Sequence, residues 1–366
     1  MVEQRNAINS LSPYIPGKPI DEVKRELGID RVIKLASNEN PLGNSPAATK
    51  AVEEWAKNMA IYPDGNGTSL KLALSEKLGV DPDQILLGAG TDQILEIIAQ
   101  TYINPGDNAI MGVPSFPRYD SVVKIMDGQS IEVPLTQDYR MNLNGFLEKI
   151  NDKTKIIWLC NPNNPTGTII SAQEQLDFIK RVPKDVLVVL DEAYYEYARG
   201  GDYPESLELL NEFDNIIILR TFSKAYGMAG LRIGYAISNK DIIGYLNRVR
   251  GPFNTNAGAQ VAAIAALKDQ EFIKKSIQSN NQGKEYLYSA FDKMGLEYIP
   301  TYANFLMVNV NLSSVEVFKA LLKKGVIIRS GDIYGMDDWI RVTIGTQEEN
   351  EIFVEALKEV INDLKN

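Results

Sequence analysis

Short apolar runs alternate with amphipathic segments through the first two thirds of the chain. Several runs are apolar at consecutive positions, which is typical of strands buried on both faces. The predicted strands are 85–90, 109–113, 155–160, 185–192, 215–221 and 232–238. Segments 91–100 and 171–182 have helical spacing, and Ser171 with Glu174 gives the second a capping-box start. This order predicts an α/β fold with a mainly parallel sheet sandwiched by helices.

The pattern changes after about residue 255. Longer helical stretches are mixed there with short strands: helices at 257–268, about 271–294, 314–324 and 346–364, and strands at 305–310, 326–330 and 339–345. We therefore predict an N-terminal arm rich in Pro and Gly (1–34), a large domain (35–255) and a smaller α+β C-terminal domain (256–366).

Composition narrows the classes of function. The net charge is −10 and no dense Lys/Arg run occurs, which argues against binding to nucleic acid. The single cysteine, Cys160, excludes an internal disulfide and fits a reducing compartment. The N-terminus has no apolar signal segment, and no run approaches the length of a membrane span. We therefore expect a cytoplasmic protein without a membrane partner.

The sequence contains no histidine, and this restricts the chemistry further. Ser-His and Cys-His catalytic pairs and histidine-ligated metal sites are excluded, and we expect no metal. Proton transfer near neutral pH would therefore use a lysine, a carboxylate, a tyrosine or a cofactor.

The segment GAGTD (88–92) joins a predicted strand to a predicted helix. Thr91 could cap this helix while free backbone N–H groups bind a phosphate, although the segment alone is better explained as a plain turn. A dinucleotide site is weakly supported. GAGTDQ lacks the third glycine of G-x-G-x-x-G, and no acidic residue ends the next predicted strand.

Two further polar positions follow buried strands. Asp191 would point into the crevice at the carboxyl edge of the sheet, where such folds bind ligands; a turn cap or an ion pair explains it equally well. The loop CNPNNPTG (160–167) is rigid because of its Asn-Pro steps, and a cis peptide at Asn164–Pro165 is compatible with it. Asn164 could donate its amide to a ring oxygen, but such a loop needs no function.

Lys224 lies in TFSKAYGMAGLR (221–232), directly after a predicted strand. A lysine in such a loop is more often solvated than catalytic. In the crevice, loss of water and the charge of Arg232 would lower its pKa and increase the neutral amine fraction. Thr221, Ser223 and Arg232 would suit a phosphate dianion. Together these groups match the parts of pyridoxal phosphate. The helix start matches its phosphate, the carboxylate its pyridinium, the asparagine its ring oxygen and the lysine its aldehyde.

The chain also resembles a known family almost from end to end. The segments SPYIPGKPIDEV, KLASNENP, IYPDG, GAGTD, CNPNNPTGT, VVLDEAYYEY, LRTFSKAYGMAGLRIGY and IRVTIGT resemble, in order, motifs of fold-type I pyridoxal-phosphate aminotransferases. The resemblance is strongest to histidinol-phosphate aminotransferases. It implies a homodimer in which Tyr62 reaches the cofactor phosphate of the other subunit.

The resemblance also implies roles in cofactor binding. Lys224 would bind the cofactor covalently and carry the proton from the substrate α-carbon, Asp191 would pair with the pyridine nitrogen, and Asn164 and Tyr194 would hydrogen-bond the ring oxygen. The residues implied for the phosphate are Gly90, Thr91, Thr221, Ser223 and Arg232. Phe116 would stack on the ring, where many relatives have tyrosine. Gln93 stands where relatives commonly have glutamate, so no role is carried over to it.

For the substrate, the resemblance implies contacts from Tyr14, Asn38 and Arg341, with Arg329 as a second cation; a salt bridge explains Arg329 equally well. The implied reaction is transamination between L-histidinol phosphate and 2-oxoglutarate, giving imidazole acetol phosphate and L-glutamate in histidine biosynthesis, with aromatic amino acids as secondary donors. Alternatives are an aromatic aminotransferase and a phosphothreonine decarboxylase of related fold. A cofactor-sensing transcriptional regulator is not expected, because only about thirty residues precede KLASNENP.

Overall fold

The computed structural model describes residues 2–13 and 17–365. Its larger sheet has seven strands in the order β2-β8-β7-β6-β5-β3-β4. The strands are β2 (Ile85–Gly88), β3 (Asn108–Val113), β4 (Gln129–Pro134), β5 (Thr154–Cys160), β6 (Leu187–Asp191), β7 (Ile216–Thr221) and β8 (Gly234–Ile237). All pairings are parallel except those of β8, which runs antiparallel to β2 and β7. The predicted α/β fold with a mainly parallel sheet is confirmed.

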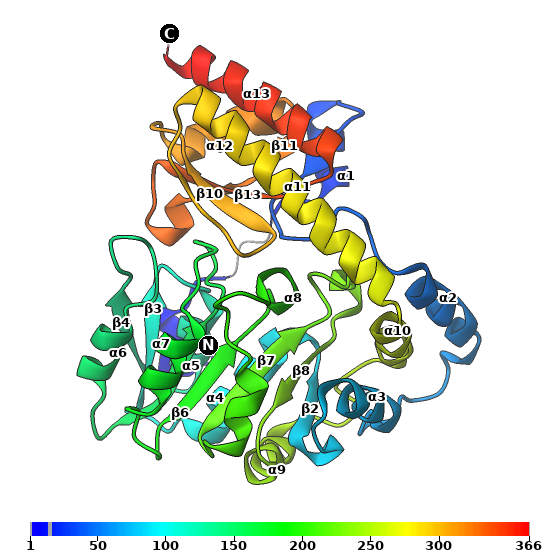
Figure 1. Cartoon of the computed structure of the whole chain (residues 1–366), viewed down its shortest axis with the longest axis vertical. Helices are drawn as coiled ribbons and strands as arrows, with labels where there is room; N and C mark the ends of the chain where they lie inside the picture. Colours follow the sequence, from blue (N-terminus) through cyan, green and yellow to red (C-terminus); the bar gives the residue numbers. More distant parts are fainter. Residues whose placement is uncertain (1, 14–16, 366) are drawn as a thin grey trace.

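Helices flank this sheet (Figure 1). They are α2 (Pro46–Trp55), α3 (Thr68–Leu78), α4 (Gly90–Tyr102), α5 (Arg118–Ile125), α6 (Leu143–Lys149), α7 (Ala172–Ile179), α8 (Tyr195–Ala198), α9 (Lys240–Val249) and α10 (Ala257–Lys268). Helix α4 packs against α5 and α9, and α6 packs against α7. Every residue of β6 and β7 is buried, as the consecutive apolar positions of those strands predict.

A second, antiparallel sheet of four strands lies above the first in Figure 1, in the order β12-β13-β10-β9. Its strands are β9 (Tyr298–Ile299), β10 (Phe305–Asn309), β12 (Arg329–Ser330) and β13 (Trp339–Thr343), and its helices are α11 (Gln270–Met294), α12 (Ser314–Lys323) and α13 (Gln347–Lys365). A separate apolar core lies between this sheet and these helices. This is the smaller unit of strands and helices that the changed sequence pattern indicates.

Three details differ from the sequence-based picture. The predicted strand 326–330 is divided into β11 (Val326–Ile327) and β12, which belong to different sheets, because β11 pairs instead with β1 (Ile33–Lys34). The predicted arm contains a regular helix, α1 (Ile20–Leu27). Alanines of α10 pack in the core of the large sheet. The division between domains near residue 255 therefore stays a prediction.

No helix within residues 2–13 and 17–365 is both long enough and apolar enough to span a membrane.

An ion pair is buried within the large sheet. Arg220 of β7 contacts Glu192, which follows β6, with an N–O distance of 2.9 Å; both side chains are at most 3% exposed. The guanidinium carbon also lies 3.5 Å from the ring centroid of Tyr195. Such a pair costs much desolvation, so loss of one partner leaves an uncompensated buried charge.

We predict that Arg220→Met lowers the free energy of unfolding by about 3–5 kcal/mol, the range for breaking a buried pair. The double variant Arg220→Met/Glu192→Leu should recover most of this loss, because no buried charge then remains. Urea unfolding of the two variants and the wild type measures both effects. An Arg220→Met protein as stable as the wild type would contradict the prediction.

Candidate active site

A cavity of about 250 Å³ opens where the carboxyl edge of β5, β6 and β7 faces the smaller sheet. Its walls also include the segment 36–39 and the start of α4. Most of the predicted site residues line it: Asn38, Thr91, Phe116, Asn164, Asp191, Tyr194, Thr221, Ser223, Lys224, Arg232, Arg329 and Arg341. The structure thus brings together positions that are up to 303 residues apart in sequence (38 to 341).

Lys224 extends from the loop after β7 into this cavity. Its Nζ atom donates a hydrogen bond to the carbonyl oxygen of Ser37 (3.2 Å). Enough protein surrounds the ammonium group to disfavour its charged form, and Arg341 and Arg232 add repulsion, whereas Glu39 opposes the shift. The pKa of Lys224 is lowered to about 8. A useful fraction of the amine is therefore neutral, and so nucleophilic, near neutral pH.

Asp191 is the last residue of β6 and is only 4% exposed. Burial raises its pKa to about 6, while hydrogen bonds from the Tyr119 hydroxyl (2.7 Å to Oδ2) and the Ala193 N–H group (3.2 Å to Oδ1) act in the opposite direction. Above pH 6 the group is mainly a carboxylate. A buried anion on a cavity wall is well matched to a positively charged partner in the cavity.

The start of α4 lies beside Arg232. A Cβ atom on Gly90 would come within 2.4 Å of Arg232 Nη2, and Gly90 has a φ of +76°, so both space and backbone favour glycine. Arg232 itself has a φ of 54°, an unusual conformation for a non-glycine residue that is often found at functional sites. Its Nη1 atom donates to Ser223 Oγ (3.4 Å). The Thr221 hydroxyl accepts from the Ser223 N–H group (3.0 Å). These groups and the helix start form a site suited to an anion.

Asn164 and Tyr194 also line the cavity. The Asn164 Oδ1 atom accepts a hydrogen bond from Arg341 Nη1 (2.6 Å), so its NH₂ group supplies any further donor to the cavity. The Tyr194 hydroxyl accepts from Asn38 Nδ2 (3.0 Å), and burial raises the pKa of this tyrosine well above its ordinary value. Asn38 has a φ of 55° and also accepts from the Thr343 hydroxyl (3.1 Å).

Arg341 and Arg329 occupy directly paired positions on β13 and β12. Arg341 donates to Asn164, to the Tyr334 hydroxyl (2.8 Å) and to the Ala36 carbonyl (2.8 Å), and within residues 2–13 and 17–365 no carboxylate forms an ion pair with it. Like charges at paired positions repel each other. An anion in the cavity would offset this repulsion and would compensate Arg341, whose described hydrogen-bond partners are neutral.

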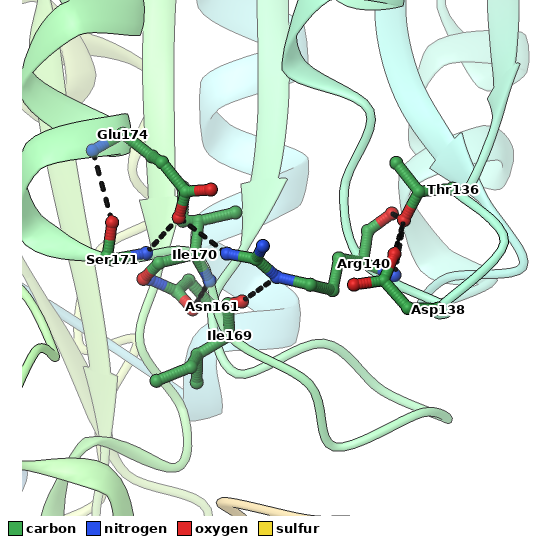
Figure 2. A network of polar contacts seen from close by, with 8 residues as sticks. All are labelled: Thr136, Asp138, Arg140, Asn161, Ile169, Ile170, Ser171 and Glu174. Atoms are coloured by element: carbon green, nitrogen blue, oxygen red, sulfur yellow. Dashed lines mark hydrogen bonds and ion pairs between the residues drawn. The ribbon is translucent and has the colours of Figure 1, made fainter.

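Contacts outside the cavity hold the loop that carries Asn164 (Figure 2). The Asn161 side chain exchanges two hydrogen bonds with the backbone of Ile170 (3.2 and 3.3 Å), which closes the loop. Arg140 donates to the Ile169 carbonyl (2.9 Å) and pairs with Glu174. The capping box of Ser171 and Glu174 is confirmed. The Asn164–Pro165 peptide is cis.

Some predicted residues lie elsewhere. Tyr62 is 79% exposed and stacks on Phe253 (4.7 Å between ring centroids), away from the cavity of its own chain. Tyr14 lies outside the described residues. Gln93 accepts from the Ala89 N–H group and the Asn254 amide (both 2.8 Å), so its role within the described structure is to support the turn before α4.

Sequence reasoning missed two tyrosines with direct contacts to site residues. Tyr119 donates to Asp191, and the Tyr334 hydroxyl accepts from Arg341. Tyr119 lies one helical turn after Phe116 in PSFPRY, and this spacing is the one signal that could have indicated it. Tyr334 follows β12 in GDIYG, where nothing in the sequence distinguishes it from an ordinary turn residue.

The donors around the cavity fit pyridoxal phosphate. The amine of Lys224 suits an aldehyde, the buried carboxylate of Asp191 suits a protonated ring nitrogen, and the glycine-lined helix start beside Arg232 suits a phosphate. Each of these groups would be unusual alone, and together they lie on one cavity.

Residues 30–357 match the family model described as aminotransferase class I and II. The chain belongs to this family. The histidinol-phosphate aminotransferase of Caldicellulosiruptor saccharolyticus is 55% identical over 357 residues, which cover 98% of this chain and 99% of that protein. This relationship establishes the chain as an aminotransferase.

Solved structures agree with this placement. Histidinol-phosphate aminotransferase from Sinorhizobium meliloti, in complex with pyridoxal-5′-phosphate, superposes with a TM-score of 0.92 at 29% identity, covering 100% of this chain and 99% of that one. L-threonine-O-3-phosphate decarboxylase from Porphyromonas gingivalis gives a TM-score of 0.80 at 23% identity, covering 90% and 100%. The latter likeness shows the shared fold alone. The fold is that of the type I pyridoxal-phosphate transferases.

We predict that Lys224 of the cofactor-free aminotransferase reacts with formaldehyde and a reducing agent at lower pH than surface lysines do. Only the neutral amine reacts, so modification should rise with a midpoint near pH 8 for Lys224 and about two units higher for surface lysines. Mass spectrometry of peptides after brief labelling from pH 6 to 11 measures both midpoints. Coinciding midpoints would show that the cavity does not activate Lys224.

Proposed function

We propose that this aminotransferase catalyses transamination between L-histidinol phosphate and 2-oxoglutarate, giving imidazole acetol phosphate and L-glutamate. The paired arginines Arg329 and Arg341 carry the proposal, because they add two positive charges to the cavity that also contains the anion site of Arg232. The Arg232 site suits a cofactor phosphate, and the arginine pair suits a substrate anion. The identity to curated histidinol-phosphate aminotransferases, 55% and 52% over 98% of the chain for two of them, supports this choice of donor.

Pyridoxal phosphate, when bound, supplies an aldehyde that exchanges with amines and a ring that accepts the electron pair released at the substrate α-carbon. We assign its phosphate to Gly90, Thr91, Ser223 and Arg232, with Thr221 orienting Ser223. Phe116 lines the cavity where it can contact a ring face.

Asp191 would hold the ring nitrogen, and its negative charge would favour protonation of that nitrogen. Asn164, whose Oδ1 accepts from Arg341, would donate its NH₂ group to the ring oxygen, and Tyr194, whose oxygen accepts from Asn38, would donate its hydroxyl proton to the same atom. The high pKa of Tyr194 keeps this donor protonated throughout the working pH range.

Lys224 is the base that moves the proton. Its lowered pKa leaves part of the amine neutral, so it can take a proton from the substrate α-carbon and would return it to the carbon of the cofactor aldehyde group. No histidine is needed for this step, and none is present. Arg341 and Arg329 hold the phosphate of histidinol phosphate or the carboxylate of the oxo-acid, and so fix the α-carbon relative to Lys224.

We predict that Arg329→Ala raises KM for L-histidinol phosphate at least about 10-fold and changes the reaction with L-phenylalanine little, because only the former presents a dianion to this cation. The loaded enzyme is mixed with each donor without oxo-acid, and the absorbance of the bound cofactor is followed before and after 2-oxoglutarate is added. Arg248→Ala, a change at an arginine on α9 beside Tyr245, is the matched control.

Lys224→Ala should be inactive with every donor. Conversion with phenylalanine alone would identify an aromatic aminotransferase, and carbon dioxide release from L-phosphothreonine would identify a decarboxylase. If Arg329→Ala loses activity equally with L-histidinol phosphate and L-phenylalanine, Arg329 does not select the donor.

We further propose that the enzyme works as a cytoplasmic homodimer with small molecules as its only substrates. Tyr62 and Phe253 form an exposed aromatic pair, and Met59 and Ile61 beside them are also exposed. Exposed apolar groups of this kind are typical of interfaces. In the dimer, Tyr62 would reach the cofactor phosphate of the partner subunit.

Subunit mixing tests this arrangement. Tyr62→Ala and Lys224→Ala homodimers should each be impaired, whereas mixed dimers should contain one site with both native residues and so recover about a quarter of wild-type activity in a random mixture. Activity is assayed after the two variants are unfolded together and refolded. If Tyr62 acts within its own subunit, no mixed dimer contains an intact site and mixing recovers nothing.

A further inference from the structure

Asp191 is held by a tyrosine that does not line the cavity. The Tyr119 hydroxyl donates to Asp191 Oδ2 at 2.7 Å, and the Tyr119 side chain has no exposed surface. The carboxylate receives one other hydrogen bond from the described protein, the longer one from Ala193 N–H to Oδ1 (3.2 Å). The hydrogen bond from Tyr119 is therefore the shorter of the two, and it is the one that comes from a side chain.

The tyrosine ring is itself fixed on two sides. It stacks on Trp158 of β5, with 5.3 Å between centroids and 7° between planes, and meets Phe116 edge to face at 5.6 Å and 83°. Trp158 and Cys160 are two positions apart on β5, so their side chains lie on the same face of the sheet. A ring packed in this way cannot follow the carboxylate if the carboxylate rotates. Its position determines where Asp191 Oδ2 lies.

We propose that Tyr119 is the positioning residue for Asp191: it holds Oδ2 so that the carboxylate presents a fixed, ionised edge to the cofactor ring. This inference rests on the proposed role of Asp191 at the ring nitrogen. Tyr119 does not line the cavity and so touches neither substrate nor cofactor; it acts through Asp191.

The chemistry of the contact supports this role. Desolvation favours the neutral acid, and each hydrogen bond donated to the carboxylate favours the anion. Burial raises the pKa of Tyr119 well above its ordinary value, so the phenol remains a donor throughout the range in which enzymes work. A tyrosine therefore supports the carboxylate at a strength that does not vary with pH.

Other groups near Asp191 must be considered in any pH experiment. They are Asp92 of α4, Cys160 of β5, Glu192 after β6, Tyr194 before α8, and Lys224 on the same cavity. Burial raises the pKa of Cys160 to about 12. Lys224 titrates near pH 8, two units above Asp191 near pH 6. Because all these groups are unchanged in Tyr119→Phe, a difference between this variant and the wild type on the acid side reports Asp191.

The test compares Tyr119→Phe with Tyr288→Phe. The control removes a hydroxyl that accepts from the Thr301 N–H group (2.7 Å), in the part of the chain near the smaller sheet. Cofactor-free full-length protein is titrated with pyridoxal phosphate from pH 5 to pH 9, and the dissociation constant is measured by quenching of tryptophan fluorescence. Circular dichroism confirms that each variant is folded.

Cofactor binding is linked to the ionisation of Asp191, and this linkage gives the direction of the pH effect. Affinity depends on the ionised form of Asp191, so it falls as the pH drops through the pKa of this group. Loss of the Tyr119 donor raises that pKa. We expect the acid-side midpoint of Tyr119→Phe to lie about one unit higher than in the wild type. Cofactor binding should then be about 10-fold weaker at pH 5, equal to about 1.4 kcal/mol, and about 2-fold weaker at pH 7. Tyr288→Phe should match the wild type in both respects.

An unchanged dissociation constant and midpoint in Tyr119→Phe would overturn the inference. Weaker binding without a shifted midpoint would also overturn it, because a merely structural role would produce that result. Asp191→Asn separates this inference from the proposed function. If Asp191→Asn binds the cofactor as the wild type does, Asp191 does not bind the ring nitrogen and the inference is also wrong. If Asp191→Asn binds more weakly but Tyr119→Phe does not, Tyr119 does not position Asp191, and the proposed function is unaffected.

Discussion

The Arg341 guanidinium joins three distant parts of the chain at one point. From β13 of the smaller sheet it donates to Asn164, on the loop after β5 of the large sheet, and to the carbonyl of Ala36 in the N-terminal segment. Its Nε atom is buried without a partner within the described structure. A buried cation with neutral partners is costly unless an anion completes its surroundings. The position of the two sheets and the identity of the ligand are therefore coupled through one side chain.

Two cationic regions lie on the wall of the cavity. The first is Arg232 beside the start of α4, where it also pairs with Asp92 (3.6 Å), and the second is Arg329 with Arg341. Lys224 and Asp191 lie on the same cavity. A substrate with an anionic group and an amine can satisfy the second region and reach Lys224 at once. The cavity thus selects for distance between charges as well as for their sign.

Much of the fold follows from the sequence because the relevant forces are local. Strands β6 and β7 have runs of consecutive apolar positions and are fully buried, and the capping box of Ser171 and Glu174 involves residues only three positions apart. The division of 326–330 into two strands could not be predicted, because it depends on the pairing of Val326 and Ile327 with Ile33 and Lys34, nearly three hundred residues earlier. For the same reason the contact of Tyr119 could not be predicted, because its partner Asp191 is 72 residues away. Tyr334 lies only seven residues before its partner Arg341, but nothing in its turn sequence indicates the contact.

The pKa values of Asp191 and Lys224 give the cavity a natural pH window. Between about pH 6 and pH 8 the free protein holds an ionised carboxylate and a lysine that is still largely protonated. The carboxylate is then ready to bind a ring cation, whereas the lysine must lose a proton before it can attack an aldehyde. Burial is the main cause of the lowered pKa of Lys224, and the charge of Arg341 adds to it, so the side chain that joins the two sheets also favours the neutral amine. A loosely docked smaller sheet would move Arg341 away and leave Lys224 with a higher pKa.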